Sequence, residues 1–204
     1  MIAIVDYGLG NIQAIANIYK KLNIECSVAR SAAELCAADQ LILPGVGSFD
    51  WAMKRLNESG MRDALDEQVL RARKPVLGIC VGLQMMARRS DEGSMAGLGW
   101  IDAEVRRFEP DRLRSGLRLP HMGWNDVLPR PDVTIFRDLG ESVRFYFLHS
   151  YYVVTDREAD TLATTDYGGS FACSAGHDNV YGVQFHPEKS HQWGVQLLKN
   201  LASA

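Results

Sequence analysis

The sequence lacks the features that mark several large protein classes. It holds four cysteines in 204 residues, none of them in a C-x-x-C pair, which argues against a disulfide scaffold and a zinc-ribbon site. No apolar run reaches the roughly 18 residues of a membrane span. The 22 basic residues are outnumbered by 25 acidic ones, for a net charge of −3, so we expect neither a nucleic-acid surface nor a membrane surface.

The remaining composition is typical of a globular protein, since 47% of the residues are apolar. We expect a single domain over residues 1–204, because two cores would leave only about 100 residues each. Residues 1–6 carry no basic leader and reach Asp6 at once, so we expect no signal peptide. With its unpaired, scattered cysteines, the chain fits a reducing, cytoplasmic location best.

Strand-like and helical patterns alternate over the first 90 residues. Apolar side chains between residues 12 and 22 recur at i, i+3 and i+4, which predicts an amphipathic helix. Such alternation predicts βαβ units and a mostly parallel sheet. The expected strands cover residues 1–6, 26–29, 41–43 and 75–79, and the expected helices cover residues 12–22, 53–71 and 81–88.

The second half contains strand-like runs with few helical patterns between them. We therefore expect an α/β fold in which an open, mostly parallel twisted sheet is flanked by helices and extended by antiparallel strands. The expected strands cover residues 102–108, 119–127, 143–154, 161–165, 171–174 and 180–185, and a last helix covers residues 194–201.

The most specific local motif is Gly78-Ile79-Cys80-Val81-Gly82, between an expected strand and an expected helix. It has the G-x-nucleophile-x-G spacing of a nucleophile elbow, with Cys80 in place of serine. A thiol beside a helix N-terminus has a lowered pKa, which raises its thiolate fraction. The alternative is a small buried cysteine at a tight turn, and the motif alone leaves that alternative open.

A second motif, Gln184-Phe185-His186-Pro187-Glu188, lies near the C-terminus. Pro187 favours an extended backbone at His186, which places residues 186 and 188 on the same face. Glu188 could then orient the imidazole of His186, as in a catalytic triad. For an isolated H-x-E, a surface ion pair is the competing interpretation. A zinc deaminase is excluded, because no cysteine pair follows Glu188.

Two glycine-containing turns could be binding loops, and only one of them remains a candidate. In Pro44-Gly45-Val46-Gly47-Ser48, backbone N–H groups could approach a ligand and supply an oxyanion hole, although an ordinary turn is a strong competitor. Gly8-Leu9-Gly10-Asn11 lacks the third glycine of a dinucleotide fingerprint, because Gln13 stands in its place. We therefore expect no dinucleotide cofactor, and no other cofactor is indicated.

The remaining histidines do not indicate a metal. His149 lies in an aromatic, strand-like run and is expected to be a hydrogen-bonded core or edge histidine. His177 and His191 lie in polar stretches and are expected to face solvent. Since no cluster of histidine, cysteine and acidic residues has metal-ligand spacing, we expect no metal site.

Taken together, the order of an oxyanion loop, a G-x-C-x-G motif and a terminal H-P-E resembles the class I (triad) glutamine amidotransferase family over the full length. The resemblance implies a flavodoxin-like α/β fold. Its closest branch comprises glutaminase subunits that supply ammonia to a synthase forming imidazole glycerol phosphate in histidine biosynthesis. The segments that carry the resemblance are residues 5–11, 43–47, 78–84, 120–125, 146–151 and 182–190.

The resemblance implies a role for each matching position. Cys80 would attack the side-chain amide carbon of L-glutamine, His186 would carry the proton, and Glu188 would orient His186. The matching oxyanion donors, substrate-binding residues and partner-interface residues form three further groups. These are Val46 or Gly47 and Val81 for the oxyanion; Gly47, Gln84, Glu92, Ser150 and Tyr151 for glutamine; and Asn11, His121, Met122, Gly123, Trp124, Asn125 and Lys189 for the partner.

The implied partner is a synthase subunit with a (β/α)₈ barrel, in a heterodimer. Three alternatives stay open from the sequence. A paralogue could feed ammonia to another synthase, for example one making an amidino-sugar. A non-catalytic regulatory subunit would not need an intact Cys80, His186 and Glu188. A cysteine peptidase of similar fold would act on γ-glutamyl peptides.

Overall fold

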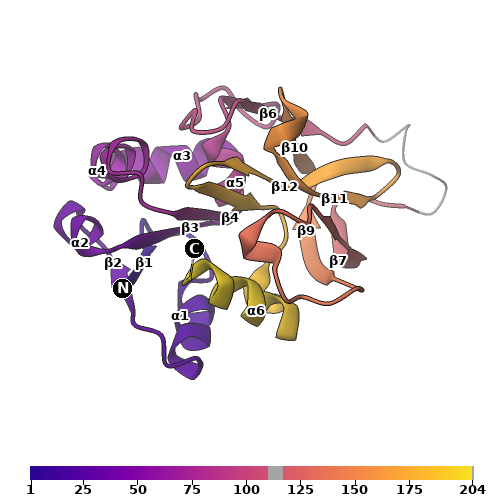
Figure 1. Ribbon diagram of the computed structural model, residues 1–204. Coiled ribbons are helices and arrows are strands. Elements are labelled where there is room, and N and C mark those ends of the chain that lie inside the picture. The colour runs from indigo at the N-terminus through magenta and orange to yellow at the C-terminus, as the bar shows by residue number, and fades with distance from the viewer. Residues whose placement is uncertain (110–116, 204) are drawn as a thin grey trace.

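The computed structural model describes residues 1–109 and 117–203, and its main feature is one large mixed sheet (Figure 1). Its first five strands are parallel to one another, and antiparallel pairing begins beyond them. In pairing order the main path runs β2 (Cys26–Ala29), β1 (Ile2–Val5), β3 (Gln40–Gly45), β4 (Val76–Cys80), β13 (Val180–Val183), β12 (Ser170–His177), β10 (Tyr151–Thr155), β6 (Ala103–Arg107) and β5 (Arg89–Ser90).

Four further strands extend this architecture. β11 (Thr161–Asp166) pairs with β12 and with the short β8 (Leu128–Pro129). β7 (His121–Asp126) and β9 (Arg144–His149) form a separate antiparallel pair, with His121 opposite His149. The expected fold, a mostly parallel sheet with added antiparallel strands, is therefore confirmed.

Helices cover both faces of the parallel part of the sheet (Figure 1). α1 (Ile12–Lys21) and α6 (His191–Leu201) lie on one face, and α3 (Phe49–Glu58), α4 (Arg62–Asp66) and α5 (Val81–Met86) lie on the other. Because both faces are covered, β1, β3 and β4 are almost entirely buried, as their apolar sequences predict. Within the described residues, no helix combines the length and apolarity needed to cross a membrane.

Two expected elements differ from the structure, and two observed elements were not expected. The single helix expected over residues 53–71 is wrong, because Gly60 adopts a left-handed backbone (φ +72°) and separates α3 from α4, which continues as a π-helix over Glu67–Arg71. The run over residues 143–154 divides at Ser150 into β9 and β10. The short helix α2 (Ala32–Ala37) and strand β5 were not predicted from the sequence.

An aromatic core connects β9 to the segment that follows β13. The rings of Phe145 and Phe185 stack with their centroids 3.8 Å apart, and Phe147 meets Phe185 edge to face. All three side chains are fully buried. This packing fixes the backbone immediately before His186.

The C-terminal helix is fastened to the core by a buried amide. Asn200 Nδ2 donates hydrogen bonds to the carbonyl oxygens of Ile135 (3.1 Å) and Arg137 (2.6 Å). Asn200 is 3% exposed and its bond with Ile135 is buried, so water cannot replace that bond.

We therefore expect Asn200→Ala to lower the free energy of unfolding by about 1–3 kcal/mol, because the buried Ile135 carbonyl and the part-buried Arg137 carbonyl lose their donor. Gln192→Ala is the matched control, since Gln192 is exposed on the same helix and should change stability by less than about 0.5 kcal/mol. Urea denaturation of both variants measures the difference. Equal stabilities would show that the amide does not fasten α6.

Candidate active site

Cys80 lies at the strand-to-helix turn that the sequence predicts. It is the last residue of β4, and α5 begins at Val81. Its backbone has φ +56° and ψ −112°, a combination that L residues rarely adopt and that costs about 1–3 kcal/mol. A side chain at Gly82 would collide with the carbonyl oxygen of Leu43, so β3 and the turn can approach this closely only with glycine there.

The same turn lies beside the glycine-containing loop. Gly45 is the register partner of Cys80 between β3 and β4, so Val46 and Gly47 follow directly beside the thiol. Gly47 has φ +87°, and a side chain there would be in ordinary van der Waals contact with Trp51. The N–H groups predicted to hold an oxyanion, at Val46 or Gly47 and at Val81, therefore come from segments that meet at Cys80.

His186 and Glu188 form a buried pair. His186 Nδ1 lies 2.8 Å from Glu188 Oε1, and the two side chains are only 5% and 1% exposed. Cys80 lines the same cavity as His186, and the thiol is among the groups that raise the pKa of His186. The structure thus brings the three predicted catalytic side chains together in the order thiol, imidazole and carboxylate.

The electrostatics of the pair favour a charged imidazole. Burial opposes the charge on His186, but the hydrogen bonds with Cys80 and Glu188 outweigh it and raise the pKa of His186 to about 10. Burial likewise opposes the charge on Glu188, but the hydrogen bonds from His186 and Asn11 hold the pKa of its carboxyl below the usual value. At neutral pH, His186 therefore carries a proton that it can transfer.

The segment that carries His186 and Glu188 is held by Tyr146 and Ser190. The backbone N–H of His186 donates to the carbonyl of Tyr146 (2.9 Å). Ser190 Oγ donates to the carbonyl of His186 (2.6 Å) and accepts from the N–H of Tyr146 (3.0 Å). Ser190 is fully buried, so this clamp fixes both ends of the H-P-E turn.

Cys80 and His186 line a cavity of about 350 Å³, a size suited to a small-molecule substrate. Besides Cys80 and His186, it is lined by the predicted oxyanion and substrate residues and by three residues that were not predicted. The first group comprises Val46, Gly47, Val81, Gln84, Glu92, Ser150 and Tyr151, and the second comprises Pro120, Leu148 and His149. Asn11 and Lys189, which were predicted at the partner interface, also line the cavity.

Gln84 is oriented by two neighbours. Its Nε2 donates to the carbonyl of Tyr151 (3.2 Å) and to Gln184 Oε1 (3.0 Å). Because both N–H groups of this amide are used, its oxygen is the group left to contact a ligand. Gln84 can therefore accept a hydrogen bond in the cavity and cannot donate one without breaking an existing bond.

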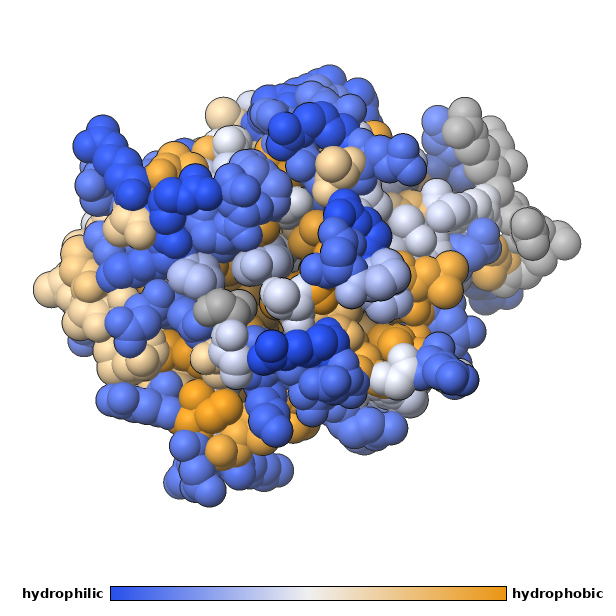
Figure 2. Space-filling model, in the orientation of Figure 1, coloured by the Kyte–Doolittle hydropathy of each residue, from blue (hydrophilic) through white to orange (hydrophobic). Residues whose placement is uncertain are grey.

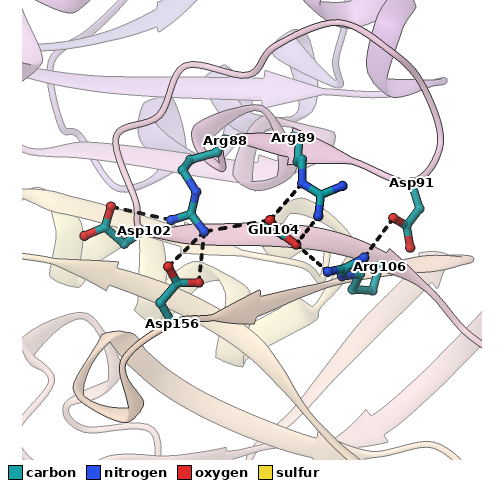
Figure 3. A network of polar contacts seen from close by, with 7 residues as sticks. All are labelled: Arg88, Arg89, Asp91, Asp102, Glu104, Arg106 and Asp156. Atoms are coloured by element: carbon teal, nitrogen blue, oxygen red, sulfur yellow. Dashed lines mark hydrogen bonds and ion pairs between the residues drawn. The ribbon is translucent and has the colours of Figure 1, made fainter.

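Glu92 is held at the start of α3, where its carboxylate accepts from the N–H of Phe49 (2.8 Å). The residues around it are anchored on both sides. Asp50 accepts from the N–H groups of Ser94 and Met95, both at 3.0 Å. On the other side, Asp91 joins an exposed network of ion pairs among the strands β5, β6 and β10 (Figure 3).

The predicted partner-interface residues differ in how exposed they are. Met122 and Trp124 are 64% and 38% exposed, and Figure 2 shows apolar side chains at the surface over β7 and β9. Gly123 and Asn125 are half-buried, and Lys189 is exposed with its Nζ 5.7 Å from the centroid of the Tyr146 ring. His121 is 2% exposed, and its role at the partner interface, like that of its neighbours, stays a prediction.

Asn11 has a place that the sequence did not indicate. It precedes α1 as its N-cap residue, yet its side chain does not cap that helix. Instead, Asn11 Nδ2 donates to Glu188 Oε1 at 2.6 Å. The other oxygen of Glu188 is buried and has no hydrogen-bond partner among the described residues, so Asn11 and His186 orient the carboxylate through one oxygen.

Comparisons with known proteins agree with this geometry. Residues 3–203 match the family described as Glutamine amidotransferase class-I. The chain is 55% identical to the imidazole glycerol phosphate synthase subunit HisH of Bdellovibrio bacteriovorus over 202 residues, which covers 99% of each chain. It is 48% identical to the HisH subunit of Leptospira interrogans, covering 100% of each.

The chain belongs to the class I glutamine amidotransferase family.

Solved structures support the same fold for this amidotransferase. A structure described as a glutamine amidotransferase superposes with a TM-score of 0.74 at 22% identity, covering 100% of this chain and 99% of the other. A chain of the PurLQS structure from Thermotoga maritima gives 0.73 at 19% identity, covering 99% and 97%. At these identities the likeness concerns the fold alone.

The three histidines outside the predicted catalytic and interface residues of the amidotransferase differ in exposure. His149 is buried and hydrogen-bonded, as expected from the sequence. His191 is exposed, and His177 is partly exposed with a 38% accessible side chain. Among the residues that the structure describes, no group of three or more histidine, cysteine or acidic side chains could hold a metal ion.

The His186–Glu188 pair predicts a pH-dependent contribution to stability. Because the pKa of Glu188 is lowered in the folded protein, its carboxylate stabilises the fold fully at pH values above 4.5, the usual pKa of a glutamate. This contribution is lost as the pH falls through the lowered pKa. The raised pKa of His186 stabilises the fold fully below 6.5, and this contribution is lost as the pH rises through about 10.

We therefore expect Glu188→Gln to lower the free energy of unfolding most between about pH 5 and 6.5, by about 1–3 kcal/mol, and less toward pH 10. Urea denaturation of the variant and the parent across this range measures the difference. The same loss of stability at every pH would contradict the ion pair.

Proposed function

We propose that this amidotransferase is the glutaminase subunit of an imidazole glycerol phosphate synthase, in which it hydrolyses L-glutamine with Cys80, His186 and Glu188. The observation that carries the chemistry is the strained turn that presents Cys80 to the buried His186–Glu188 pair in one cavity. The pathway rests on near full-length similarity to HisH subunits. We further propose that residues 1–204 form one domain and act in the cytoplasm, without a metal or another cofactor.

The reaction follows from the placement of these groups. The Cys80 thiolate attacks the side-chain amide carbon of glutamine, and the N–H groups of Val81 and of Val46 or Gly47 stabilise the oxyanion. His186 gives its proton to the amide nitrogen, the C–N bond breaks, and ammonia leaves a γ-glutamyl thioester on Cys80. Water then attacks the thioester, His186 takes a proton from it, and glutamate and the thiolate are released.

The lining residues divide the recognition of glutamine among them. Gln84 offers an amide oxygen, Glu92 offers a carboxylate, and the main chain of Ser150 and Tyr151 forms another wall. An acceptor pair of this kind suits the α-ammonium group of an amino acid. Asn11 supports the chemistry from behind by orienting Glu188.

The acceptor of the ammonia is proposed to be a (β/α)₈-barrel synthase subunit in a heterodimer. Free ammonia is mostly ammonium at neutral pH and is then a poor nucleophile, so direct transfer within a complex avoids that loss. The exposed side chains of Met122, Trp124 and Leu148 on β7 and β9 supply an apolar docking surface near the cavity, and Lys189 lies at its edge.

We expect Cys80→Ala and Cys80→Ser to abolish glutamine hydrolysis, with a loss of roughly several orders of magnitude in kcat, while the fold and partner binding persist. Iodoacetamide should inactivate the parent by labelling Cys80 first, and glutamine should protect it. Chelators should leave the activity unchanged. A folded Cys80→Ala variant with parental turnover, or labelling that begins at another cysteine, would overturn the assignment.

The experiment that tests the proposed function compares steady-state glutaminase turnover of the chain alone, with the barrel subunit, and with the barrel plus its nucleotide substrate. We expect a stepwise rise, chiefly in kcat. In the chain alone, a peptide plane of the loop at residues 44–47 can turn its N–H away from the thiol, which costs about a hundred- to a thousandfold in rate, and the bound partner would favour the orientation that faces the thiol. Gly47→Pro removes one candidate donor and should blunt the stimulated rate without preventing complex formation.

Full activity of the chain alone would instead favour a stand-alone hydrolase. Stimulation by a different synthase would indicate a paralogue of another pathway. Binding without any turnover would indicate a regulatory subunit.

A further inference from the structure

Two buried histidines form a chain of hydrogen bonds between β7 and the cavity. His121 Nδ1 lies 2.9 Å from His149 Nε2, and His149 Nδ1 lies 2.8 Å from the carbonyl oxygen of Tyr151. At the other end, Asn125 Nδ2 lies 3.2 Å from His121 Nε2. All four ring nitrogens therefore have a polar neighbour.

The direction of the chain follows from its ends. A carbonyl oxygen only accepts, so His149 must carry a proton on Nδ1. In a neutral ring, His149 Nε2 is then an acceptor, and His121 must donate to it from Nδ1. His121 Nε2 is left to accept from the amide N–H of Asn125. Both rings are therefore in the Nδ1–H tautomer, and every bond points toward Tyr151.

The surroundings keep both rings neutral and fixed. His121 and His149 are 2% and 6% exposed. The ring of His121 is stacked with Phe147 (centroids 4.6 Å apart) and with Tyr167 (3.9 Å). Burial lowers the pKa of His121 to about 4 and that of His149 to about 3. Neither ring can therefore turn or take up a second proton without loss of stability.

The carbonyl at the end of the chain belongs to the cavity wall. Tyr151 lines the cavity, and its carbonyl also accepts from Gln84, which lines the cavity from α5. His149 lines the cavity too, whereas His121 lies behind it.

We propose that His121 is a positioning residue for glutamine: through the Nδ1–H tautomer of His149, it fixes the Tyr151 carbonyl and thereby Gln84. This role rests on the proposed function, because it takes glutamine as the ligand of the cavity.

The tautomers can be observed directly. In the full chain labelled with ¹⁵N-histidine at pH 7, we expect two neutral rings protonated on Nδ1, one of which disappears in His121→Asn. The ¹⁵N chemical shifts of the imidazole ring distinguish this tautomer from the Nε2–H form. If the His121 and His149 rings carry their protons on Nε2, the hydrogen-bond chain is wrong.

A matched pair of variants tests the role in binding. Asparagine and leucine are similar in size, and both lose the stack with Phe147 and Tyr167, but only asparagine keeps an N–H near the position of Nδ1. With the synthase subunit present, we expect the KM for glutamine of His121→Leu to be about three- to tenfold above that of His121→Asn. The kcat values should agree within about twofold, because Cys80, His186 and Glu188 are unchanged in both variants.

The outcomes separate this role from the proposed function. Equal KM values in the two folded variants, or the other tautomer in an active parent, would overturn the role of His121 alone. A parent chain that neither binds nor hydrolyses glutamine would overturn the proposed function, and the role of His121 with it. Thermal unfolding identifies a variant that fails to fold. In that case, the tautomers of His121 and His149 in the parent chain decide whether the proposed role of His121 stands.

Discussion

The backbone of Cys80 is held in a left-handed conformation, and the rest of the site depends on how that conformation is maintained. The strain of about 1–3 kcal/mol persists because β4 is buried between parallel neighbours and because Gly82 lets the turn pack on β3. This packing places the thiol next to Val46 and Gly47 and opposite His186. The strained turn thus brings the candidate nucleophile, its base and the oxyanion loop together.

The parts that the sequence predicts correctly are those with local signals. Continuous apolar runs predict the buried parallel strands, and glycines around Cys80 predict the turn. His186 and Glu188 are two residues apart, so an extended backbone is enough to pair them. The roles given to the cavity residues by resemblance stay predictions, although the structure places Gln84 and Glu92 at the same cavity as Cys80.

The parts that the sequence does not predict depend on contacts between distant segments. Asn11 meets Glu188 across 177 residues, and Ser190 joins the H-P-E turn to β9 across 44. No periodicity of a single segment reports such contacts. His121 lies in β7, whose other side chains are exposed or half-buried, and its own ring is covered by Phe147 and Tyr167. Gly60 is a different case, because its left-handed backbone is a local feature that ends a helix where the apolar pattern alone would continue it.

The most direct test of the account is to trap the covalent intermediate. The chain, bound to its synthase subunit and mixed with isotope-labelled glutamine, is quenched in acid during turnover and mapped by peptide mass spectrometry. The account predicts a γ-glutamyl thioester on the peptide that contains Cys80, and its absence from Cys80→Ser. Turnover with no adduct on Cys80, or with an adduct on another residue, would contradict it.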